Sequence, residues 1–572
     1  MTPQNLGTFY SDKVIMSGKK IGSILFWLMV GVYILYSAVF IYKTIIVVNG
    51  QHYAVLFDDA MISMQYARNL AHGYGPVFNA GGDRVEGYSN PLWVGYMALF
   101  HLLPIPTPYI SLAIQISGAI FMVLSLILIR RITTSMLDSP SAWLIPLVAV
   151  GLTAFYYPLT QWSLLGLEVS ILTLLASLVV WIVLNLLKEQ KFSVWLYILL
   201  GVCTLIRIDM LGLGLVTWAF LVLVDKKNRS KNLLWGTVIL GAFVIGQTVA
   251  RYLYYGNVLP NTYYLKMTGS PLSIRIKRGF YVFFKFVWNF NVVLFLLPFL
   301  YLLFRRDRAV WYLFLAFGVQ VVYSIYVGGD AWENRGGANR FFAIVMPIFM
   351  VLFALTLEKL RQAILAFMRA GPKPLLSRWV EPLSHSALLG LALISLINFN
   401  SLLDTDSLQY ATLQKPSIYV IGQEKILRIA LFARQITTPQ ATILAVAAGG
   451  VPYFSGRTTY DLLGKSDSLI AHEAMHIDPA ASLLDFRPGH NKWDYAHSIG
   501  DLKPDLIPEI WEGTQAEAQP YLKDYTVIQM DQFKQWLPNG VMYVRTGSPN
   551  ILWNQIQQYI VPKETGMVIK PK

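Results

Sequence analysis

Apolar runs long enough to cross a lipid bilayer recur through the first two-thirds of this 572-residue chain, and they constrain its fold more than any other feature. A membrane-spanning helix needs about 20 mostly apolar residues. The composition agrees, because only 14% of the residues are charged, whereas about a quarter are charged in a typical soluble protein. We therefore expect a mainly α-helical polytopic membrane protein with about eleven transmembrane helices. The predicted spans are 21–48, 109–129, 142–158, 168–187, 192–207, 210–224, 232–252, 281–304, 309–328, 340–360 and 385–403.

Basic clusters set the predicted orientation. Lysines at 19–20 precede the first span and predict a cytoplasmic N-terminus, because positive residues stay on the cytoplasmic side. The apolar run 91–104 is short, and a full crossing there would move the arginines at 130–131 outside, so we interpret it as a juxtamembrane or re-entrant helix. The basic cluster at 275–278 falls on the outer side. Either these residues contact a lipid phosphate, or the predicted number of spans is wrong by one at this point. The alternative is that their side chains snorkel at the membrane interface.

The last part of the chain changes character. Residues 404–572 are more polar and are punctuated by Pro and Gly, which predicts a small α/β domain outside the membrane. Residues 1–403 would then form a transmembrane catalytic domain with an outer loop at 49–108. The strand candidates of the C-terminal domain are 442–447, 525–530 and 541–546, and its helix candidates are 420–436 and 549–560.

The net charge of +14 does not indicate a nucleic-acid partner, because most of the cations lie beside apolar segments, as orientation signals do. The single cysteine, Cys203, lies inside an apolar run and excludes an intrachain disulfide. The first apolar run is too long for the hydrophobic region of a cleavable signal peptide.

Two adjacent carboxylates, Asp58 and Asp59, follow the first span and begin a helix-like run that stops at Gly73. One aspartate is enough to cap a helix, so the other is a candidate general base. Further polar and ionisable side chains are predicted at the outer ends of the spans, where such groups are costly and mark a site. For each arginine or lysine among them, interfacial anchoring is the alternative. These residues are His72, Glu86, Glu168, Arg207, Asn261, Tyr264, Lys266, Asp330, Arg335 and Arg340.

Several motifs resemble a known group of enzymes. The stretch "DDAMISMQYARNLAHGYGPVFNAGGDRVEGYSNPLW" and the pieces "LPNTYYLK", "GGD", "GGVPYFSG", "YDLLG" and "RPGHNKWDY" resemble the terminal arabinofuranosyltransferase B family. More broadly, an acidic pair after the first span, many spans and an outer C-terminal domain resemble the class C glycosyltransferases. The resemblance implies a polyprenyl-phosphate sugar donor, arabinofuranose among the candidates, and an acceptor glycan or protein outside the membrane.

The resemblance also implies roles for the residues. Asp58 would be the base and Asp59 would cap the helix or orient the site, although the two roles are interchangeable. One direct displacement would invert the anomeric centre, and an oxygen-rich site would also suit a divalent cation, Mg²⁺, Mn²⁺ or Ca²⁺. We expect the donor phosphate and sugar to contact Lys266, Arg335, Arg340, Asn261, Tyr264, Glu168 and Arg207. We expect the acceptor to contact His72, Glu86, Asp330, Asp461 and His490.

Two other classes of function stay open. "HEAMH" places His472, Glu473 and His476 in the H-E-x-x-H pattern, which on a helix would make a zinc metalloprotease site. Against this, His490 and His497 are only loosely placed as a third ligand. A non-catalytic transporter is the second alternative, although the chain lacks two matching halves with broken spans.

Overall fold

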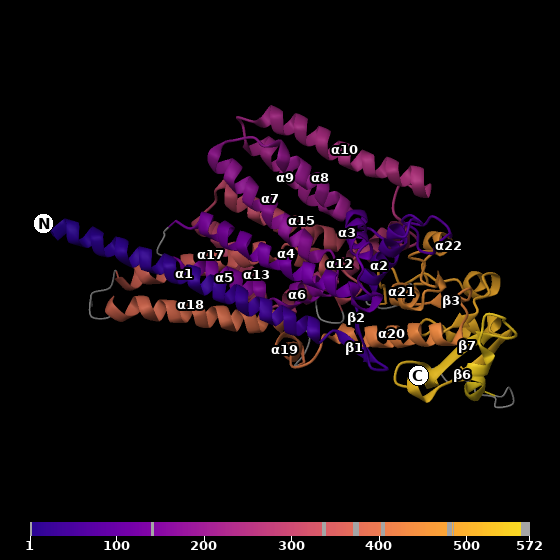
Figure 1. The fold of residues 1–572 in the computed structure, drawn as a ribbon. Coiled ribbons are helices and arrows are strands. Elements are labelled where there is room, and N and C mark those ends of the chain that lie inside the picture. The colour runs from indigo at the N-terminus through magenta and orange to yellow at the C-terminus, as the bar shows by residue number, and fades with distance from the viewer. Residues whose placement is uncertain are drawn as a thin grey trace. The chain divides into compact units, whose positions relative to one another are not determined.

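The structure is a computed structural model that describes residues 3–138, 142–333, 339–369, 377–401, 406–477, 483 and 485–561 (Figure 1). The chain divides into two compact units, and both are discontinuous in sequence. The helical unit comprises Met1–Lys43, Gln115–Ile245 and Ile276–Pro416, and the mixed unit comprises Thr44–Ile114, Gly246–Arg275 and Ser417–Lys572. The predicted division at 403/404 lies shortly before Ser417, and the prediction did not foresee the two earlier segments of the mixed unit.

Among the described residues, six helices are long and apolar enough to span a membrane, and the number rises to eight if each of two bent pairs is one span. The six are α1 (Pro3–Tyr42, apolar from Lys20), α4 (Thr107–Met136), α7 (Val169–Glu189), α10 (Arg229–Tyr255), α15 (Arg308–Tyr326) and α18 (Ser377–Asn400). The bent pairs are α5 (Leu144–Ala154) with α6 (Tyr157–Leu164), at 55°, and α12 (Leu272–Asn289) with the segment Val292–Phe304, which holds α13 (Val292–Leu296) and α14 (Tyr301–Phe304), at 105°.

Three of the predicted spans are helices outside this set, so the count of eleven stays a prediction. α8 (Val194–Ile206) and α9 (Leu211–Val224) are apolar but short, and at about 1.5 Å per residue each falls short of a bilayer core of about 30 Å. The third is α17 (Met346–Arg369), which follows the short α16 (Arg340–Ala343).

Helix α17 forms the core of the helical unit, because it packs against α5, α15 and α18. Its Phe349 and Phe353 are almost completely buried. Other aromatic rings surround them in stacked and edge-on arrangements, and the closest pair is Phe290 and Phe399, whose ring centroids are 4.0 Å apart. Burial of large aromatic side chains is a strong packing contribution.

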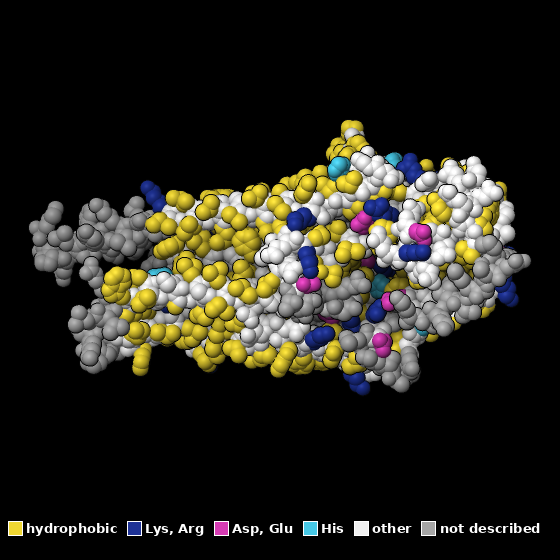
Figure 2. Space-filling model, turned by 90° about the horizontal axis from the view of Figure 1, so that it is seen from below, with side chains coloured by type: hydrophobic (Ala, Val, Ile, Leu, Met, Phe, Trp, Pro, Cys, Tyr) yellow, Lys and Arg dark blue, Asp and Glu magenta, His cyan; other side chains and the backbone are white. Residues whose placement is uncertain are grey.

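Large apolar side chains also cover the exposed surface of the long helices. On the face shown in Figure 2, hydrophobic side chains dominate this part of the molecule. Leu28 and Leu35 of α1 are 62% and 64% exposed, and Leu393 of α18 is 62% exposed. A soluble protein does not keep such a contiguous apolar surface in water, so these helices belong in lipid and the protein is a multi-pass membrane protein.

The mixed unit contains a five-stranded sheet with the strand order β4-β3-β5-β7-β6. The strands are β3 (Thr442–Ala445), β4 (Thr458–Asp461), β5 (Leu506–Ile507), β6 (Tyr525–Gln529) and β7 (Val541–Arg545). β3 is parallel to β4 and β5, whereas β7 is antiparallel to β5 and β6. Apolar residues alternate between the two faces, as in Ile443 and Leu444, which belong to different core clusters. Helix α20 (Ile418–Ile436) packs its apolar side on the first of these clusters.

The strands at 442–447, 525–530 and 541–546 and the helix at 420–436 were predicted, whereas β4 and β5 were not. The predicted helix at 549–560 is shorter than expected, because it forms only as α24 (Trp553–Ile556) followed by one 3₁₀ turn (Gln557–Tyr559). The remaining short helices of this unit are α11 (Asn261–Met267), α21 (Gly450–Ser455), α22 (Ser468–His472) and α23 (Gln515–Ala518), and α19 (Ser407–Ala411) belongs to the helical unit.

The end of the first predicted span is also wrong. α1 ends at Tyr42, and residues 45–54 form a hairpin of β1 (Ile45–Val48) and β2 (Gln51–Ala54). Asn49 and Gly50 both have positive φ angles, of 51° and 78°, as the two-residue turns of tight hairpins require. The β-branched residues before this turn extend the apolar run of α1, which concealed the strand. After the hairpin, α2 (Asp58–Ala71) packs along α3 (Pro91–His101), the helix of 11 residues expected at 91–104.

Candidate active site

The acidic pair lies at the N-terminus of α2. Phe57 is extended, with φ −61° and ψ 145°, and Asp58 and Asp59 form the first turn of the helix. Their carboxylates are favourable there, because the first backbone N–H groups of a helix carry partial positive charge. The following turns are fixed by burial, and Met61 and Met64 are completely inaccessible. The acids are therefore attached to a rigid element.

Asp58 is held by backbone amides from a distant part of the chain. Its Oδ1 accepts hydrogen bonds from Gly450 N at 2.8 Å and Gly449 N at 3.2 Å. A Cβ atom at position 449 would lie 2.1 Å from the carbonyl oxygen of Asp58, so only glycine permits this approach. Burial raises the pKa of Asp58 to about 6, although Lys465 and the two amides oppose the rise. A carboxyl group with such a pKa is suited to accept a proton near neutral pH.

Asp59 pairs instead with Lys465. The Lys465 Nζ atom donates to Asp59 Oδ1 at 2.8 Å, and the lysine is only 9% exposed. Burial by itself would lower the pKa of Lys465, but Asp59 and Asp58 outweigh it and the pKa is raised. Lys465 is therefore charged and neutralises Asp59. Sequence reasoning missed it, although it directly follows the quoted motif "YDLLG".

The loop 461–467 is fixed by Asp461 and Asn261. Asp461 accepts hydrogen bonds from Leu463 N at 3.1 Å and Ser466 N at 2.7 Å, which closes the loop on itself. Burial raises the pKa of Asp461 to about 6, against the effect of Lys465. The Asn261 side-chain amide donates to three loop carbonyls, those of residues 464, 465 and 467, at 2.9 to 3.0 Å. Both residues were predicted to bind substrate, and in the structure both hold the backbone that carries Lys465.

Lys266 lies on α11, which Lys492 anchors. The buried Lys492 ammonium donates to Ala471 O at 2.7 Å and Tyr264 O at 3.1 Å. The Tyr264 ring lies 4.2 Å from the ring of His472, measured between centroids. Lys266 packs its alkyl chain beside Gly489, where a Cβ atom would lie 3.1 Å from Lys266 Cε.

His490 is close to the same charged groups. Burial, together with Lys465 and Lys266, lowers the pKa of His490 to about 3 against the effect of Asp59. The imidazole is therefore neutral at physiological pH. Lys266, Lys465, His490 and the acidic pair thus form one electrostatically coupled cluster within the mixed unit.

Two other predicted residues of the mixed unit lie in different surroundings. Glu86 is 5% exposed and forms an ion pair of 2.5 Å with Arg251. His72 is exposed and follows the last residue of α2. Since α2 has 14 residues, at about 1.5 Å per residue His72 lies roughly 20 Å along the helix from Asp58.

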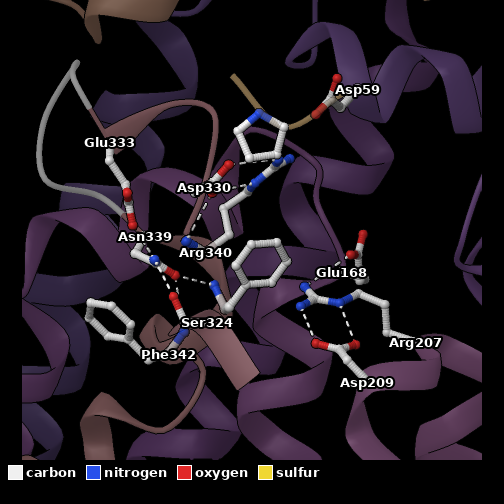
Figure 3. Close-up of polar contacts among 12 residues, drawn as sticks. Asp59, Glu168, Arg207, Asp209, Ser324, Asp330, Glu333, Asn339, Arg340 and Phe342 are labelled. Carbon is white, nitrogen blue, oxygen red and sulfur yellow. Dashed lines mark hydrogen bonds and ion pairs between the residues drawn. The ribbon is translucent and has the colours of Figure 1, made fainter. Parts of the chain in front are cut away.

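The helical unit contains its own buried charges, drawn in Figure 3. Arg207 donates to both carboxylate oxygens of Asp209, at 2.8 and 2.5 Å, and lies 3.3 Å from Glu168. All three side chains are less than 10% exposed. The trio has a formal charge of minus one, so it does not by itself attract a phosphate. The contact of Arg207 and Glu168 with the donor stays a prediction.

A second ion pair joins Asp330 and Arg340. The guanidinium donates to both carboxylate oxygens, at 2.8 and 3.0 Å, and also lies over the ring of Trp162 at 5.5 Å. The Asp330 side chain is only 1% exposed. The roles of these two residues with substrate stay predictions, and Arg335 lies outside the described residues.

Glu333 is another largely buried acid of this unit, with its side chain 10% exposed. It accepts a hydrogen bond from Asn339, which also donates to Ser324 Oγ at 2.7 Å (Figure 3). Burial raises the pKa of Glu333 to about 7, against the effect of Arg278.

The structure removes the basis for a zinc protease. α22 ends at His472, and Glu473 is extended, with φ −69° and ψ 172°. His476 stacks on Trp493 at 4.2 Å between centroids, so the two histidines do not share a helix face. Across the described parts of the chain, no group of three or more His, Cys, Asp or Glu residues could hold a metal ion. The divalent cation considered above stays a prediction.

Comparison with solved structures defines the class of fold. The chain is similar to ArnT from Cupriavidus metallidurans in the apo state, with a TM-score of 0.51 and 13% identity over 92% of this chain and 98% of that one. The structure of ArnT bound to undecaprenyl phosphate gives a TM-score of 0.52 and 13% identity, over 90% and 97% of the two chains. The fold is that of the class C glycosyltransferases, polytopic membrane enzymes with a sheet-containing C-terminal domain.

The sequence is also similar to a characterised relative. The terminal β-(1→2)-arabinofuranosyltransferase of Mycobacterium tuberculosis is 25% identical over 216 residues. The match covers 36% of this chain and 34% of that protein, so it spans about a third of the relative. The resemblance suggested by the motifs is thereby confirmed. Residues 416–550 match a family described only as a domain of unknown function, DUF8728.

Proposed function

We propose that this protein is a membrane glycosyltransferase that moves a sugar from a polyprenyl-phosphate carrier to a hydroxyl group of an acceptor glycan. The observation that carries the proposal is the environment of Asp58, a carboxylate on a rigid helix end whose pKa is raised to about 6 mainly by burial. The class C fold, and the similarity to ArnT bound to undecaprenyl phosphate, support a polyprenyl-phosphate carrier.

Asp58 and Asp59 have different roles in this proposal. Asp59 is neutralised by Lys465 at 2.8 Å, whereas Asp58 accepts only backbone N–H groups among the hydrogen bonds given above. Asp58 is therefore the general base, and the Asp59–Lys465 pair is a positioning element. Because Asp59 is paired with Lys465, the proton of the acceptor hydroxyl goes to Asp58 and not to Asp59 in this proposal.

The reaction then proceeds by one displacement. Asp58 takes the proton from the acceptor hydroxyl. The oxygen of this hydroxyl forms a bond to the anomeric carbon as the bond between this carbon and the phosphate oxygen breaks. Charge spreads over the sugar in an oxocarbenium-like state, as in glycoside hydrolysis. The polyprenyl phosphate leaves as an anion, so no general acid is required. The configuration at the anomeric carbon is inverted.

Cations stabilise the leaving phosphate in this mechanism. Lys266 is the first candidate, because it belongs to the cluster around Asp59, Lys465 and His490. A cation that meets the developing charge stabilises the transition state more than the ground state. Arg340, whose guanidinium pairs with Asp330, and Arg335 stay candidates from the sequence alone.

The similarity to the mycobacterial enzyme supports arabinofuranose as the sugar. The test is a transfer assay with the purified protein and radiolabelled polyprenyl-phosphate arabinose, with polyprenyl-phosphate mannose as the competing donor. We expect transfer of arabinose by the wild type and its loss in the double variant Asp58→Asn, Asp59→Asn. Asp531→Asn is the control, because this carboxylate is 89% exposed. Full activity in the double variant would refute the proposed mechanism.

We further propose that the N-terminus is cytoplasmic and that the acidic pair lies on the outer side of a bacterial plasma membrane. Lysines at 19–20 directly before the apolar part of α1 support this orientation. Reporter fusions after residue 131 should report the cytoplasm and those after residue 278 the outside. The opposite signals would reverse the orientation.

A further inference from the structure

A cavity of about 730 Å³ lies within the mixed unit, and neither Asp58 nor Asp59 is among its lining residues. Three segments form its walls: the loop 78–86, residues 255–261 at the end of α10 and the start of α11, and residues from β4 through α22 with His497. This volume is in the range of pockets that bind small molecules or short oligomers, about 300–1,000 Å³.

The loop 78–86 is fixed before any ligand binds. Gln65 and Asn69 of α2 donate to Phe78 O at 2.8 and 2.9 Å. At its other end, Tyr66 donates to Val85 O at 2.7 Å. In between, the Asn79 side chain donates to Thr459 O at 2.9 Å and accepts from Thr459 N at 3.0 Å, so it pairs with the edge strand β4 as another strand would. Side chains that lock a wall in this way reduce the entropy cost of binding.

The groups in the cavity select against an anion. Glu86 and Asp461 are engaged with Arg251 and with the loop amides. Asp467 accepts from two amides of α22 through Oδ1 and contacts His497 at 3.0 Å through Oδ2. Asp83 and Arg84 are exposed at the rim. Carboxylates outnumber cations among the lining residues, whereas the hydroxyl groups of Thr458, Tyr460, Ser466 and Ser468 add neutral donors and acceptors.

The cavity shares a wall with the reactive cluster. Asp461 and Ser466 line the cavity, and between them in the same loop stands Lys465, which contacts Asp59. A chain bound in the cavity therefore contacts the same loop that carries the Asp59 contact. We propose that this cavity binds a neutral, hydroxyl-rich oligosaccharide segment, the part of the acceptor glycan that does not react. The role as acceptor rests on the proposed function, whereas the binding itself does not.

The experiment measures binding of a neutral α-1,5-linked arabinofuranose hexasaccharide to the full-length protein in detergent, by saturation-transfer NMR and titration. Ala80→Trp places an indole at the exposed Ala80 position in the cavity wall. We expect at least a tenfold weaker affinity in this variant and unchanged affinity in Gln435→Trp, which adds the same group to an exposed position of α20. Thr458→Trp, also on an exposed lining residue, is the second blocking variant if Ala80→Trp does not fold.

Undiminished affinity in the blocked variants, or tighter binding of tri-galacturonate than of the neutral probe, would overturn the inference. Asp58→Asn should bind the hexasaccharide as the wild type does. In the transfer assay, Ala80→Trp should raise the acceptor KM at least tenfold with little change in kcat. Binding without any transfer by the wild type would refute the proposed function alone, whereas transfer with an unchanged KM in Ala80→Trp would refute the cavity alone.

Discussion

The effect of Lys465 on Asp58 gives the most quantitative prediction. Lys465 is the strongest of the groups that oppose the effect of burial on the pKa of Asp58. An opposite charge within about 4–6 Å typically lowers the pKa of a carboxyl group by about 1–3 units. Replacement of Lys465 by Gln should therefore raise the pKa of Asp58 from about 6 to about 7 or above. One unit corresponds to about 1.4 kcal/mol, or a tenfold change in the ratio of the ionised to the protonated form.

The assay is the pH dependence of kcat/KM for sugar transfer between pH 5 and pH 9. A general base works only when it is ionised, so activity rises with pH through the pKa of the base. In the wild type, we expect the acid limb to have its midpoint near pH 6. In Lys465→Gln, this midpoint should move to about pH 7 or above, with a loss of about fivefold or more at pH 6 and a smaller loss at pH 8.

Asp59→Asn is the matched control, because it removes the same ion pair from the other side. The Asp59 carboxylate raises the pKa of Asp58, although burial raises it more. In Asp59→Asn, the midpoint of the acid limb should therefore lie at a lower pH than in the wild type. Both variants lose the same hydrogen bond, so a general loss of structure would move both limbs alike. An unshifted limb in a folded Lys465→Gln protein would refute the reasoning.

The remaining predictions concern packing in the mixed unit. Gly449→Ala should reduce transfer at least tenfold and cost roughly 1–3 kcal/mol of stability, because a Cβ atom would lie 2.1 Å from the Asp58 carbonyl oxygen. Gly422→Ala in α20 is the control. A Cβ atom there has no neighbour within 4 Å, so this variant should keep its activity in the same assay. Asp505→Ala removes a carboxylate that accepts from Thr442 N and Ser548 Oγ, at 2.9 and 2.6 Å, and also from Arg545. It should cost about 3–5 kcal/mol, measured as a lower denaturant midpoint in tryptophan fluorescence, and an unchanged midpoint would contradict this role.

The sequence carries enough information for the class of fold and for the acidic pair. A membrane-spanning helix can be recognised from its apolar run alone, because every helix that crosses lipid needs such a run. The pair Asp58–Asp59 was visible because two adjacent acids stand out soon after such a run. Strands β3, β6 and β7 were also predicted, since their β-branched and aromatic residues are bounded by turn residues.

What could not be predicted depends on contacts across long sequence separations. Lys465 looks like an ordinary surface lysine, and its role appears only because the fold brings it to Asp59, 406 positions earlier. The same is true of Asn261, which looks like a ligand-binding amide but holds three loop carbonyls. β5 has two residues, too few for any periodicity. The "HEAMH" pattern matched by its letters alone. A zinc site of this type needs a helix through the whole pattern, whereas α22 ends at His472, its first residue.

The central claim is that Asp58 takes the proton and that Asp59 positions Lys465. The most direct measurement compares the single-turnover rates of sugar transfer in Asp58→Asn and Asp59→Asn, with saturating donor and acceptor. Loss of a general base lowers the chemical step by about 10²–10⁴-fold. The account predicts a loss of this size in Asp58→Asn and a loss of about tenfold or less in Asp59→Asn. A larger loss in Asp59→Asn than in Asp58→Asn would contradict it.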